Sequence, residues 1–452
     1  MRKANWGWKK TRAIFAAVVI SSACVGAAST AAIAGTRGGE SIEDMKAMIE
    51  QLKQTVQTLE QKMAVMEENQ AETSKTVKEV AAKKAAPSGL QLPSNTTMKI
   101  YGYAKMDAIY TDTDGGGKYA YTPSAVPLDK EQDSLADNSF IMHARQTRLG
   151  FATSTDTDYG KFNIKIETDF YGAGGNERFS NSYGLRLRRA YGELGNLRIG
   201  QDWSTFIDLA AYTDTIDFGG PAGSLFIRQA MIRWTQPFSG GSAMFAIENP
   251  ENTFLVKDAD GTGNHSVNGG QNVFPDIIAR VNLDPGFGHY SLVGMLRDLS
   301  IDTAEYDDSQ LGYAFSANAV IPTFGKDSVT LEFNYGNAIG RYLNAGWDDG
   351  FLNPVTHEVE TSDQYGFVVG YQHFWLDNLR SSVIYSMAER DNDMNYVTNT
   401  ADDQYQSVHA NLIWSPVPRI NMGIEYIWAY REIENGEDGD LNRIQAGFQY
   451  KF

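Results

Sequence analysis

Residues 419–431 read RINMGIEYIWAYR, and residues 440–452 read DLNRIQAGFQYKF. In both stretches bulky apolar residues alternate with small or polar ones, so that Ile420, Met422 and Ile424 are separated by an asparagine and a glycine. Successive side chains of a β-strand point to opposite faces, and such alternation gathers the apolar side chains on one face. Each stretch therefore predicts a strand with one apolar face and one polar face.

The same alternation recurs along the chain from Met98 onward, in segments separated by turn residues. Segments of about ten residues suit strands that cross a bilayer at a tilt, and an even number of them suits a closed antiparallel barrel. We count sixteen such segments: 98–112, 139–154, 159–172, 183–194, 196–203, 225–236, 241–249, 273–284, 287–298, 308–321, 327–336, 362–375, 378–390, 402–415, 419–431 and 440–452.

The connections between these segments differ on the two sides. Those after even-numbered segments are short, such as Gly195 alone, whereas those after odd-numbered segments are mostly long and acidic. Nothing in a soluble β-sandwich requires the connections at its two ends to differ in length, whereas an outer-membrane barrel has short periplasmic turns and long extracellular loops. The last segment also alternates up to Phe452, which resembles the final strand bound by outer-membrane assembly machinery. Residues 98–452 are thus predicted to form an all-β transmembrane barrel of sixteen antiparallel strands in the cell outer membrane.

Composition excludes other classes of protein. The hydrophobic fraction of 42% and the mean hydropathy of −0.37 are too polar for a bundle of membrane helices. Past residue 34 no apolar run approaches the ~18 residues that a spanning helix needs. A single cysteine rules out a disulfide scaffold. The net charge of −17 gives no electrostatic reason to bind nucleic acid.

Residues 1–34 have the pattern of a secretory signal peptide. A basic stretch without acids is followed by an uncharged stretch that ends in Ala-Ile-Ala at Ala34. A retained membrane anchor is disfavoured because, after Ile20, this stretch has few bulky apolar residues. A lipid attached to Cys24 is also disfavoured, because Ser21 occupies the position where that signal needs a large aliphatic residue.

Residues 35–84 are predicted to form a coiled coil, and residues 85–97, rich in Pro, Gly and Ser, a linker. A single amphipathic helix is the alternative, but the apolar stripe repeats every 3.5 residues, as in self-association. Two or three strands remain open. The heptad positions are Ile42, Met45, Ile49, Leu52, Val56, Leu59, Met63, Met66, the polar Gln70 and Thr73, Val77 and Val80.

Given which side chains face lipid, the lumen-facing set follows by parity. Arginines fall on the inner face of several neighbouring strands, which makes one basic face, while later strands have mostly neutral or acidic residues there. Each could be an ordinary solvated charge; together they would concentrate anions in a narrow lumen. Parity places Tyr191 outward and assigns no role to Arg145 and Arg189. The predicted inner residues are Arg148, Arg186, Arg188, Arg198, Arg233, Arg280, Lys105 and Lys165.

Residues 204–221 are too apolar for a free extracellular loop. They resemble the third loop of general porins, which folds into the barrel and has a Phe-Gly-Gly turn, here beginning at Phe218. The resemblance places Asp208, Asp214 and Asp217 opposite the arginines, in a constriction of paired charges. Arginine suits this task because it is permanently charged and holds a carboxylate with two hydrogen bonds.

The mature chain as a whole resembles the DcaP-like trimeric outer-membrane porins of Gram-negative bacteria. The heptads carry the resemblance, together with four barrel segments: Met98–Tyr103 (MKIYGY), Arg145–Phe151 (RQTRLGF), Leu185–Gln201 (LRLRRAYGELGNLRIGQ) and the terminal Phe452. It implies a homotrimer with a periplasmic coiled coil and uptake of small anions, notably dicarboxylates.

We therefore predict a porin for passive uptake of small anions through an arginine-lined constriction. The expected partners are these solutes, outer-membrane lipid and further copies of the chain. The alternative is a general diffusion porin whose coiled coil mainly tethers the outer membrane. We expect no enzyme, cofactor or metal: Ser407 and His409 have no third catalytic partner, and residues 258–264 lack the Glu of a calcium loop.

Overall fold

The computed structural model describes residues 46–47, 49–50, 53–65, 92–132, 137–270, 272–304 and 306–452. The chain divides into two compact units, Met1–Gln91 and Leu92–Phe452. In the first unit residues 53–65 are helical, as the heptads require. The predicted signal peptide, much of the coiled coil and most of the linker lie outside the described residues. No helix of the described residues is long and apolar enough to cross a membrane.

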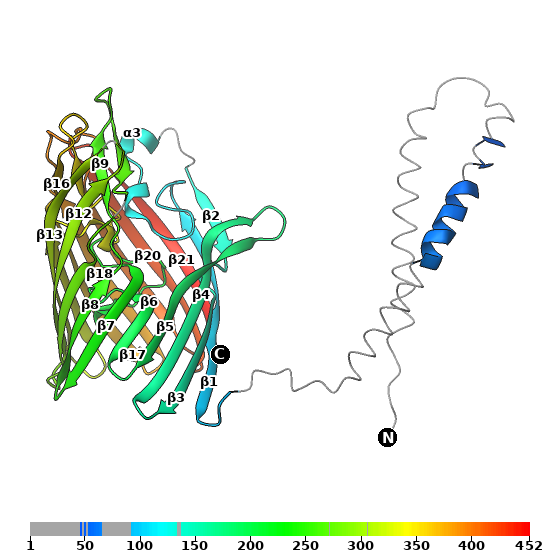
Figure 1. Cartoon of the computed structure of the whole chain (residues 1–452), viewed down its shortest axis with the longest axis horizontal. Coiled ribbons are helices and arrows are strands. Elements are labelled where there is room, and N and C mark those ends of the chain that lie inside the picture. The colour runs from blue at the N-terminus through cyan, green and yellow to red at the C-terminus, as the bar shows by residue number, and fades with distance from the viewer. Residues whose placement is uncertain are drawn as a thin grey trace. The chain divides into compact units, whose positions relative to one another are not determined.

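The second unit is a closed antiparallel barrel (Figure 1). It closes because the first strand pairs with the last, from Tyr103 opposite Lys451 to Thr111 opposite Arg443. The strands are β1 (Thr96–Thr111), β2 (Ser139–His143), β3 (Arg148–Thr157), β4 (Gly160–Asn176), β5 (Ser182–Leu194), β6 (Leu197–Trp203), β7 (Arg228–Phe238), β8 (Gly241–Glu248), β11 (Asp276–Leu283), β12 (His289–Asp302), β13 (Asp307–Pro322), β14 (Ser328–Gly336), β17 (Gln364–Leu376), β18 (Leu379–Arg390), β19 (Asp402–Trp414), β20 (Ile420–Ile433) and β21 (Asp438–Lys451).

β2 and β3 share one position in the wall, because both pair with β1. The described residues therefore form sixteen strand positions, and every predicted strand is found with its ends within four residues. The prediction of one unbroken strand over 139–154 is wrong. Residues 144–147 turn away from the sheet, and the Arg145 carbonyl accepts a hydrogen bond from Phe170 of β4, so the break leaves the wall connected.

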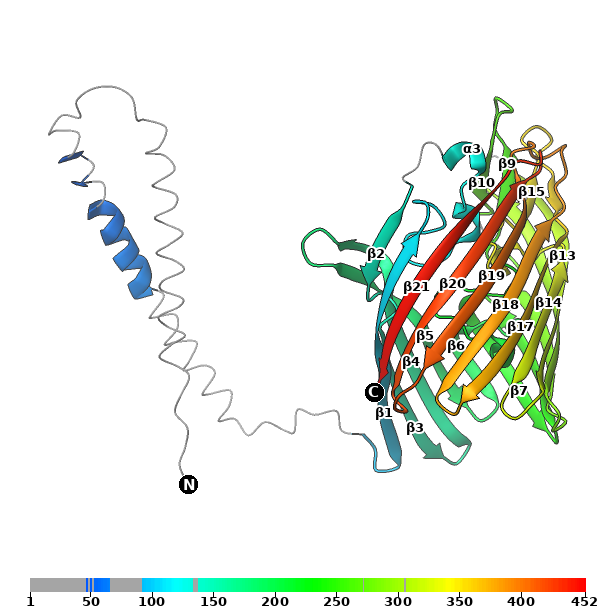
Figure 2. The ribbon, with the colours of Figure 1, turned by 180° about the vertical axis from the view of Figure 1, so that it is seen from behind.

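The alternation in the sequence becomes alternation of environment. In β11 every second residue is buried, beginning with Asp276 and including Arg280, while Ile277 and Val281 are exposed on the outside. On the opposite side of the barrel, β17 to β21 lie next to one another (Figure 2). Their outer faces expose apolar side chains such as Ile424. A continuous apolar outer face is what a lipid-embedded wall requires.

The long loops gather at one end of the barrel, the short turns at the other, as predicted (Figure 1). Two of the long loops also form a second, four-stranded sheet that the sequence did not predict. Its apolar side packs on the end of β12, where Phe254 and Leu299 are fully buried. The elements in all the long loops are β9 (Thr253–Lys257), β10 (Asn264–Asn268), β15 (Gly350–Leu352), β16 (Val359–Thr361), the 3-10 helices η1 (Pro123–Ala125), η2 (Leu209–Ala211) and η3 (Gly340–Tyr342), and α3 (Asp129–Gln132).

Candidate functional site

The inner loop, residues 204–227 between β6 and β7, folds into the lumen as predicted. It crosses to the far wall and hydrogen-bonds there through its backbone. Ile216 and Asp217 donate N–H groups to the Glu425 carboxylate of β20, at 2.7 and 3.0 Å. Gly223 donates to the Ser386 hydroxyl of β18 at 2.8 Å. The loop therefore narrows the channel from one side.

A close backbone approach holds this loop against the wall. A Cβ atom at Gly223 would lie 2.1 Å from the carbonyl oxygen of Met387, closer than any side chain tolerates. Across the contact, a Cβ at Gly366 of β17 would lie 2.5 Å from the Gly223 carbonyl oxygen. Only glycine at both positions lets the two backbones meet.

The sequence predicted that all three acidic residues of the inner loop lie opposite the basic face. In the structure, not all of them do. Asp208 pairs with Arg280 of β11 at 2.7 Å and with His289 at 2.8 Å, so Arg280 meets an opposite charge, as predicted. Asp214 pairs with Arg380 of β18 on the far wall, at 2.6 Å. These two carboxylates fasten the loop to the barrel.

Asp217 pairs with no arginine in the described part of the chain; its carboxylate accepts hydrogen bonds from the backbone N–H groups of Tyr121, Gly219 and Gly220. The Phe-Gly-Gly turn thus wraps around this side chain. Burial raises the pKa of the Asp217 carboxyl. Burial acts in the same direction on Asp208, but the Arg280 charge, with hydrogen bonds from Ser291 and His289, outweighs it and lowers the pKa of that carboxyl.

The arginines predicted on strands β3 to β7 do gather on one side of the lumen. Arg186 holds the Asp169 carboxylate with two hydrogen bonds, at 3.0 and 2.7 Å, and its side chain remains 32% exposed. Arg188 bridges Glu167 at 3.0 Å and Asp169 at 2.9 Å, and is only 2% exposed. The Nε atom of Arg148 lies 3.7 Å from Glu167. Two carboxylates of β4 therefore order three arginines.

A second group surrounds Asp202 of β6, which pairs with Arg189, Arg198 and Arg233. Arg189 had no role by parity, and the structure supplies the reason. Glu167 faces Arg189 while the next residue of β4 faces Leu187, so β5 bulges by one residue at position 188. A bulge reverses the parity of everything after it.

The same bulge makes the predicted outward position of Tyr191 wrong. Its ring lies beneath the Arg198 guanidinium, 4.2 Å from it, on the lumen side. Arg145, the other unassigned arginine, lies in the break between β2 and β3, stacked on the rings of Tyr119 and Tyr183 at 3.7 and 4.2 Å. Its role is to pack a loop against the neighbouring hairpin.

We call the cations on the inner faces of β3 to β7 the cationic wall. They outnumber the carboxylates interleaved with them, which are Glu167, Asp169, Glu193 and Asp202. Lys165 belongs to the wall, with its ammonium 5.1 Å from the Tyr101 ring. The excess of positive charge is therefore a property of this wall. Its members are Arg148, Arg186, Arg188, Arg189, Arg198, Arg228, Arg233 and Lys165.

The inner loop presents aromatic rings to the cationic wall. Phe218 stacks on Tyr171 with ring centroids 4.4 Å apart, and the Arg186 guanidinium lies 5.4 Å from the Phe218 ring and 5.2 Å from the Tyr171 ring. Phe218 also contacts Phe226 edge to face, at 5.6 Å. Aromatic rings hold a guanidinium in place without neutralising it. The wall thus keeps its charge on the side that faces the loop.

A second loop, residues 337–363, backs the inner loop from the outside. Phe226 donates its N–H to the Tyr342 carbonyl at 2.9 Å, and Asn344 donates to the Ser224 carbonyl at 2.7 Å. The Asn344 side chain donates to the Gly219 carbonyl at 2.6 Å. The constriction is therefore built from two loops, of which the sequence predicted one.

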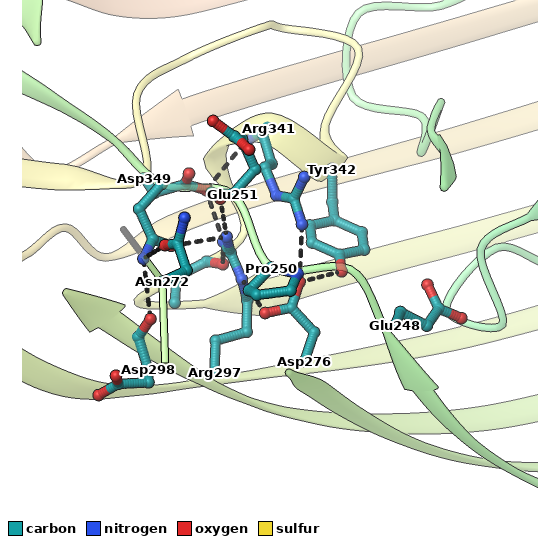
Figure 3. Close-up of polar contacts among 12 residues, drawn as sticks. Glu248, Pro250, Glu251, Asn272, Asp276, Arg297, Asp298, Arg341, Tyr342 and Asp349 are labelled. Carbon is teal, nitrogen blue, oxygen red and sulfur yellow. Dashed lines mark hydrogen bonds and ion pairs between the residues drawn. The ribbon is translucent and has the colours of Figure 1, made fainter. Parts of the chain in front are cut away.

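Arg297 of β12 anchors this second loop, at the centre of Figure 3. Its guanidinium is fully buried between Asp276 of β11 at 3.1 Å and Asp349 of the loop at 2.5 Å. Arg341 and the Tyr342 hydroxyl also reach Asp276, at 2.8 and 2.6 Å. We call these five residues the loop clamp. Parity could have placed Arg297 in the lumen, but no sequence signal linked it to a loop 52 residues away.

Two further arginines escaped the sequence analysis. Arg380 holds Asp214, and Arg228, at the first residue of β7, contacts the Phe226 ring of the inner loop. Arg228 has the same parity as the outward-facing Ile232, so alternation alone excluded it from the predicted lumen-facing residues. Its side chain turns inward because the wall opens there to release the loop. Among the described residues no group of three or more His, Cys, Asp or Glu side chains is placed to hold a metal ion.

Comparison with known proteins identifies the family of the chain. A model of the DcaP outer membrane protein family matches residues 33–452. The chain belongs to the DcaP outer membrane protein family. No curated protein matches the sequence. The resemblance that the heptads and barrel segments indicated is thus confirmed, and the DcaP family together with the barrel fold makes this protein an outer-membrane porin.

Solved structures show the same fold. The crystal structure of the outer membrane channel DcaP of Acinetobacter baumannii is 22% identical, with a TM-score of 0.70 over 80% of this chain and 99% of that chain. An anion-selective porin from Comamonas acidovorans is 13% identical, with a TM-score of 0.52 over 79% of this chain and 100% of that one. At these identities the likeness concerns the barrel.

Proposed function

We propose that this DcaP-family porin takes up small anions passively, and dicarboxylates best. The observation that carries the proposal is the excess of cations on the cationic wall. Eight permanently or predominantly charged side chains face four carboxylates across β3 to β7. In a narrow channel with low-dielectric walls, this excess raises the local concentration of anions, although the whole chain is acidic.

The preference for dicarboxylates rests on the number of exposed guanidiniums. Arg188 is buried and committed to two carboxylates, so it is not available to a solute. Arg186 and Arg148 are 32% and 20% exposed and lie along the same wall. A solute with two carboxylates contacts two such groups at once, whereas a monocarboxylate contacts one. The binding residues we propose are thus the members of the wall that are not committed to two carboxylates, as Arg188 is.

The remaining predicted residues have a supporting role in this proposal. Arg280 and Asp208, with Asp214, position the inner loop against the wall. Asp217 shapes the Phe-Gly-Gly turn that presents Phe218. The position of the inner loop sets the width of the channel opposite the cations. These residues therefore affect the passage of solutes by positioning the loop.

We also propose a homotrimer held by a periplasmic coiled coil over residues 35–84. In the described helix the heptad residues Val56, Leu59 and Met63 are 51%, 51% and 62% exposed. Their stripe has the spacing that buries against other copies of the same helix. Light scattering in mild detergent should give a trimer; a monomeric mass would contradict it.

Reversal potentials across a salt gradient test the transport proposal directly. The parent protein in planar bilayers should prefer anions, and succinate should reduce the chloride current more than butyrate does. Cation selectivity would refute the proposal. Deleting residues 38–84 tests the alternative of a structural tether. If conductance vanishes while the barrel stays folded, the barrel alone does not account for transport and the proposal is wrong.

A further inference from the structure

One arginine of the cationic wall differs from the other six. Arg148, Arg186, Arg188, Arg189, Arg198 and Arg233 each have a carboxylate oxygen within 4.0 Å. Among the described residues, Arg228 has no carboxylate within that distance and no hydrogen-bond acceptor. Within the described wall, no directly paired carboxylate therefore neutralises this guanidinium.

Aromatic rings, and not acids, hold Arg228 in position. Its guanidinium carbon lies 4.3 Å from the Trp203 ring and 5.3 Å from the Phe226 ring. Trp203 ends β6 and Arg228 begins β7, so both flank the point where the inner loop leaves the wall. The rings orient the planar group and leave its N–H donors unpaired.

The unpaired donors need an acceptor that the described protein does not provide. The Nη1 atom of Arg228 is buried without a hydrogen-bond partner in the described structure. Buried polar atoms in folded proteins nearly always have partners, and a guanidinium cannot lose its charge near neutral pH. A site of this kind is completed by an oxyanion, which accepts two parallel N–H bonds from one guanidinium.

Arg186 stands at the other end of the same row of rings. The Arg186 guanidinium lies 5.4 Å from the Phe218 ring. Phe218 contacts Phe226, and the Phe226 ring lies beneath the Arg228 guanidinium. Both cations thus flank the aromatic tip of the inner loop. Arg186 holds the Asp169 carboxylate with two hydrogen bonds, whereas Arg228 has no carboxylate within 4.0 Å in the described wall.

We propose that Arg228 is the primary anion-contact residue of the channel, and that Arg186 contacts the second carboxylate of a dicarboxylate. The proposal rests on the proposed function and names the residue that does the binding. Because Arg228 is the arginine of the described wall without a carboxylate within 4.0 Å, it contributes more to binding than any carboxylate-paired member of the wall. The solute class is small organic anions with two carboxylates.

The test uses succinate as the probe and block of the chloride current through the full-length protein in planar bilayers as the readout. Arg228→Gln should weaken succinate block by about tenfold, the effect of losing a charge-assisted contact. Arg228→Lys should keep the anion selectivity of the parent and still lose succinate affinity, because an ammonium lacks the bidentate fork. Arg419→Gln, in the exposed turn between β19 and β20, removes one charge outside the lumen and should match the parent.

The outcomes separate this inference from the function on which it rests. If the parent prefers cations, the proposed function fails. If the parent prefers anions and both Arg228 variants are blocked by succinate as the parent is, only the role of Arg228 is overturned. If Arg228→Gln does not assemble, Arg228→Lys decides: unchanged succinate affinity would refute the bidentate contact, and reduced affinity with retained anion selectivity would support it.

Discussion

Replacing Arg297 by methionine tests whether the loop clamp keeps the constriction closed. Methionine fills similar volume but leaves Asp276 and Asp349 without their shared guanidinium. Asp276 keeps Arg341 and the Tyr342 hydroxyl, whereas Asp349 keeps only backbone N–H groups, of Thr253 at 3.3 Å and Arg341 at 3.2 Å. The loss should therefore come mainly from Asp349, the residue that belongs to the loop.

The magnitude follows from the burial of the pair. Removing one partner of a fully buried ion pair costs roughly 3–5 kcal/mol, and the partners that remain place this case near 3 kcal/mol. A change of that size shifts the balance between the seated and the released loop by about a hundredfold. The barrel should persist, because its strands keep their backbone hydrogen bonds. Release of residues 337–363 should then free the inner loop, which they back.

Single-channel recording and limited proteolysis measure the effect. Arg297→Met should show higher, noisier conductance and cleavage within residues 337–363, and adding Asp349→Asn should restore part of the closure by removing the unpaired charge. Arg443→Met is the matched control: it removes another buried guanidinium, which donates to carbonyls of Gly115, Gly116 and Gly117, so the loop over 113–138 should become sensitive instead. A variant at Arg297 with the conductance and protease resistance of the parent would refute the clamp.

Four further substitutions test the roles assigned to the loop and the wall. Arg188→Ala should lower barrel stability by about 2–3 kcal/mol, seen as a lower unfolding temperature in detergent, because two buried carboxylates lose a charged donor; Arg186→Ala should lower anion selectivity with little change in that temperature. Asp217→Asn should raise conductance, because an amide has one oxygen in place of two and cannot accept all the hydrogen bonds that close the turn. An unchanged current would contradict this. Gly223→Val should displace the inner loop and widen the channel, and solute uptake into liposomes with size-graded sugars would reveal it, whereas an unaltered size limit would show that the backbones need not meet.

The sixteen strands could be predicted because each one is read locally. A transmembrane strand meets lipid on one side and the lumen on the other, so hydropathy alternates within a few residues whatever lies elsewhere in the chain. The inward position of Arg186 and Arg188 followed from Leu185 and Leu187 for the same reason. The apolar character of the inner loop also showed in the sequence, because a loop that leaves water must lose polar residues.

Tertiary structure decided which charge meets which. A one-residue bulge in β5 turned Arg189 and Tyr191 into the lumen, and bulges leave no mark in hydropathy. Alternation also hid Arg228, because its orientation depends on where the wall opens to release the inner loop. Ion pairs such as Arg297 with Asp349 join strands and loops distant in sequence, and they depend on barrel closure and loop packing. Periodicity is a property of neighbouring residues and the sequence carries it, whereas charge pairing is a property of distance in space and only the folded barrel determines it.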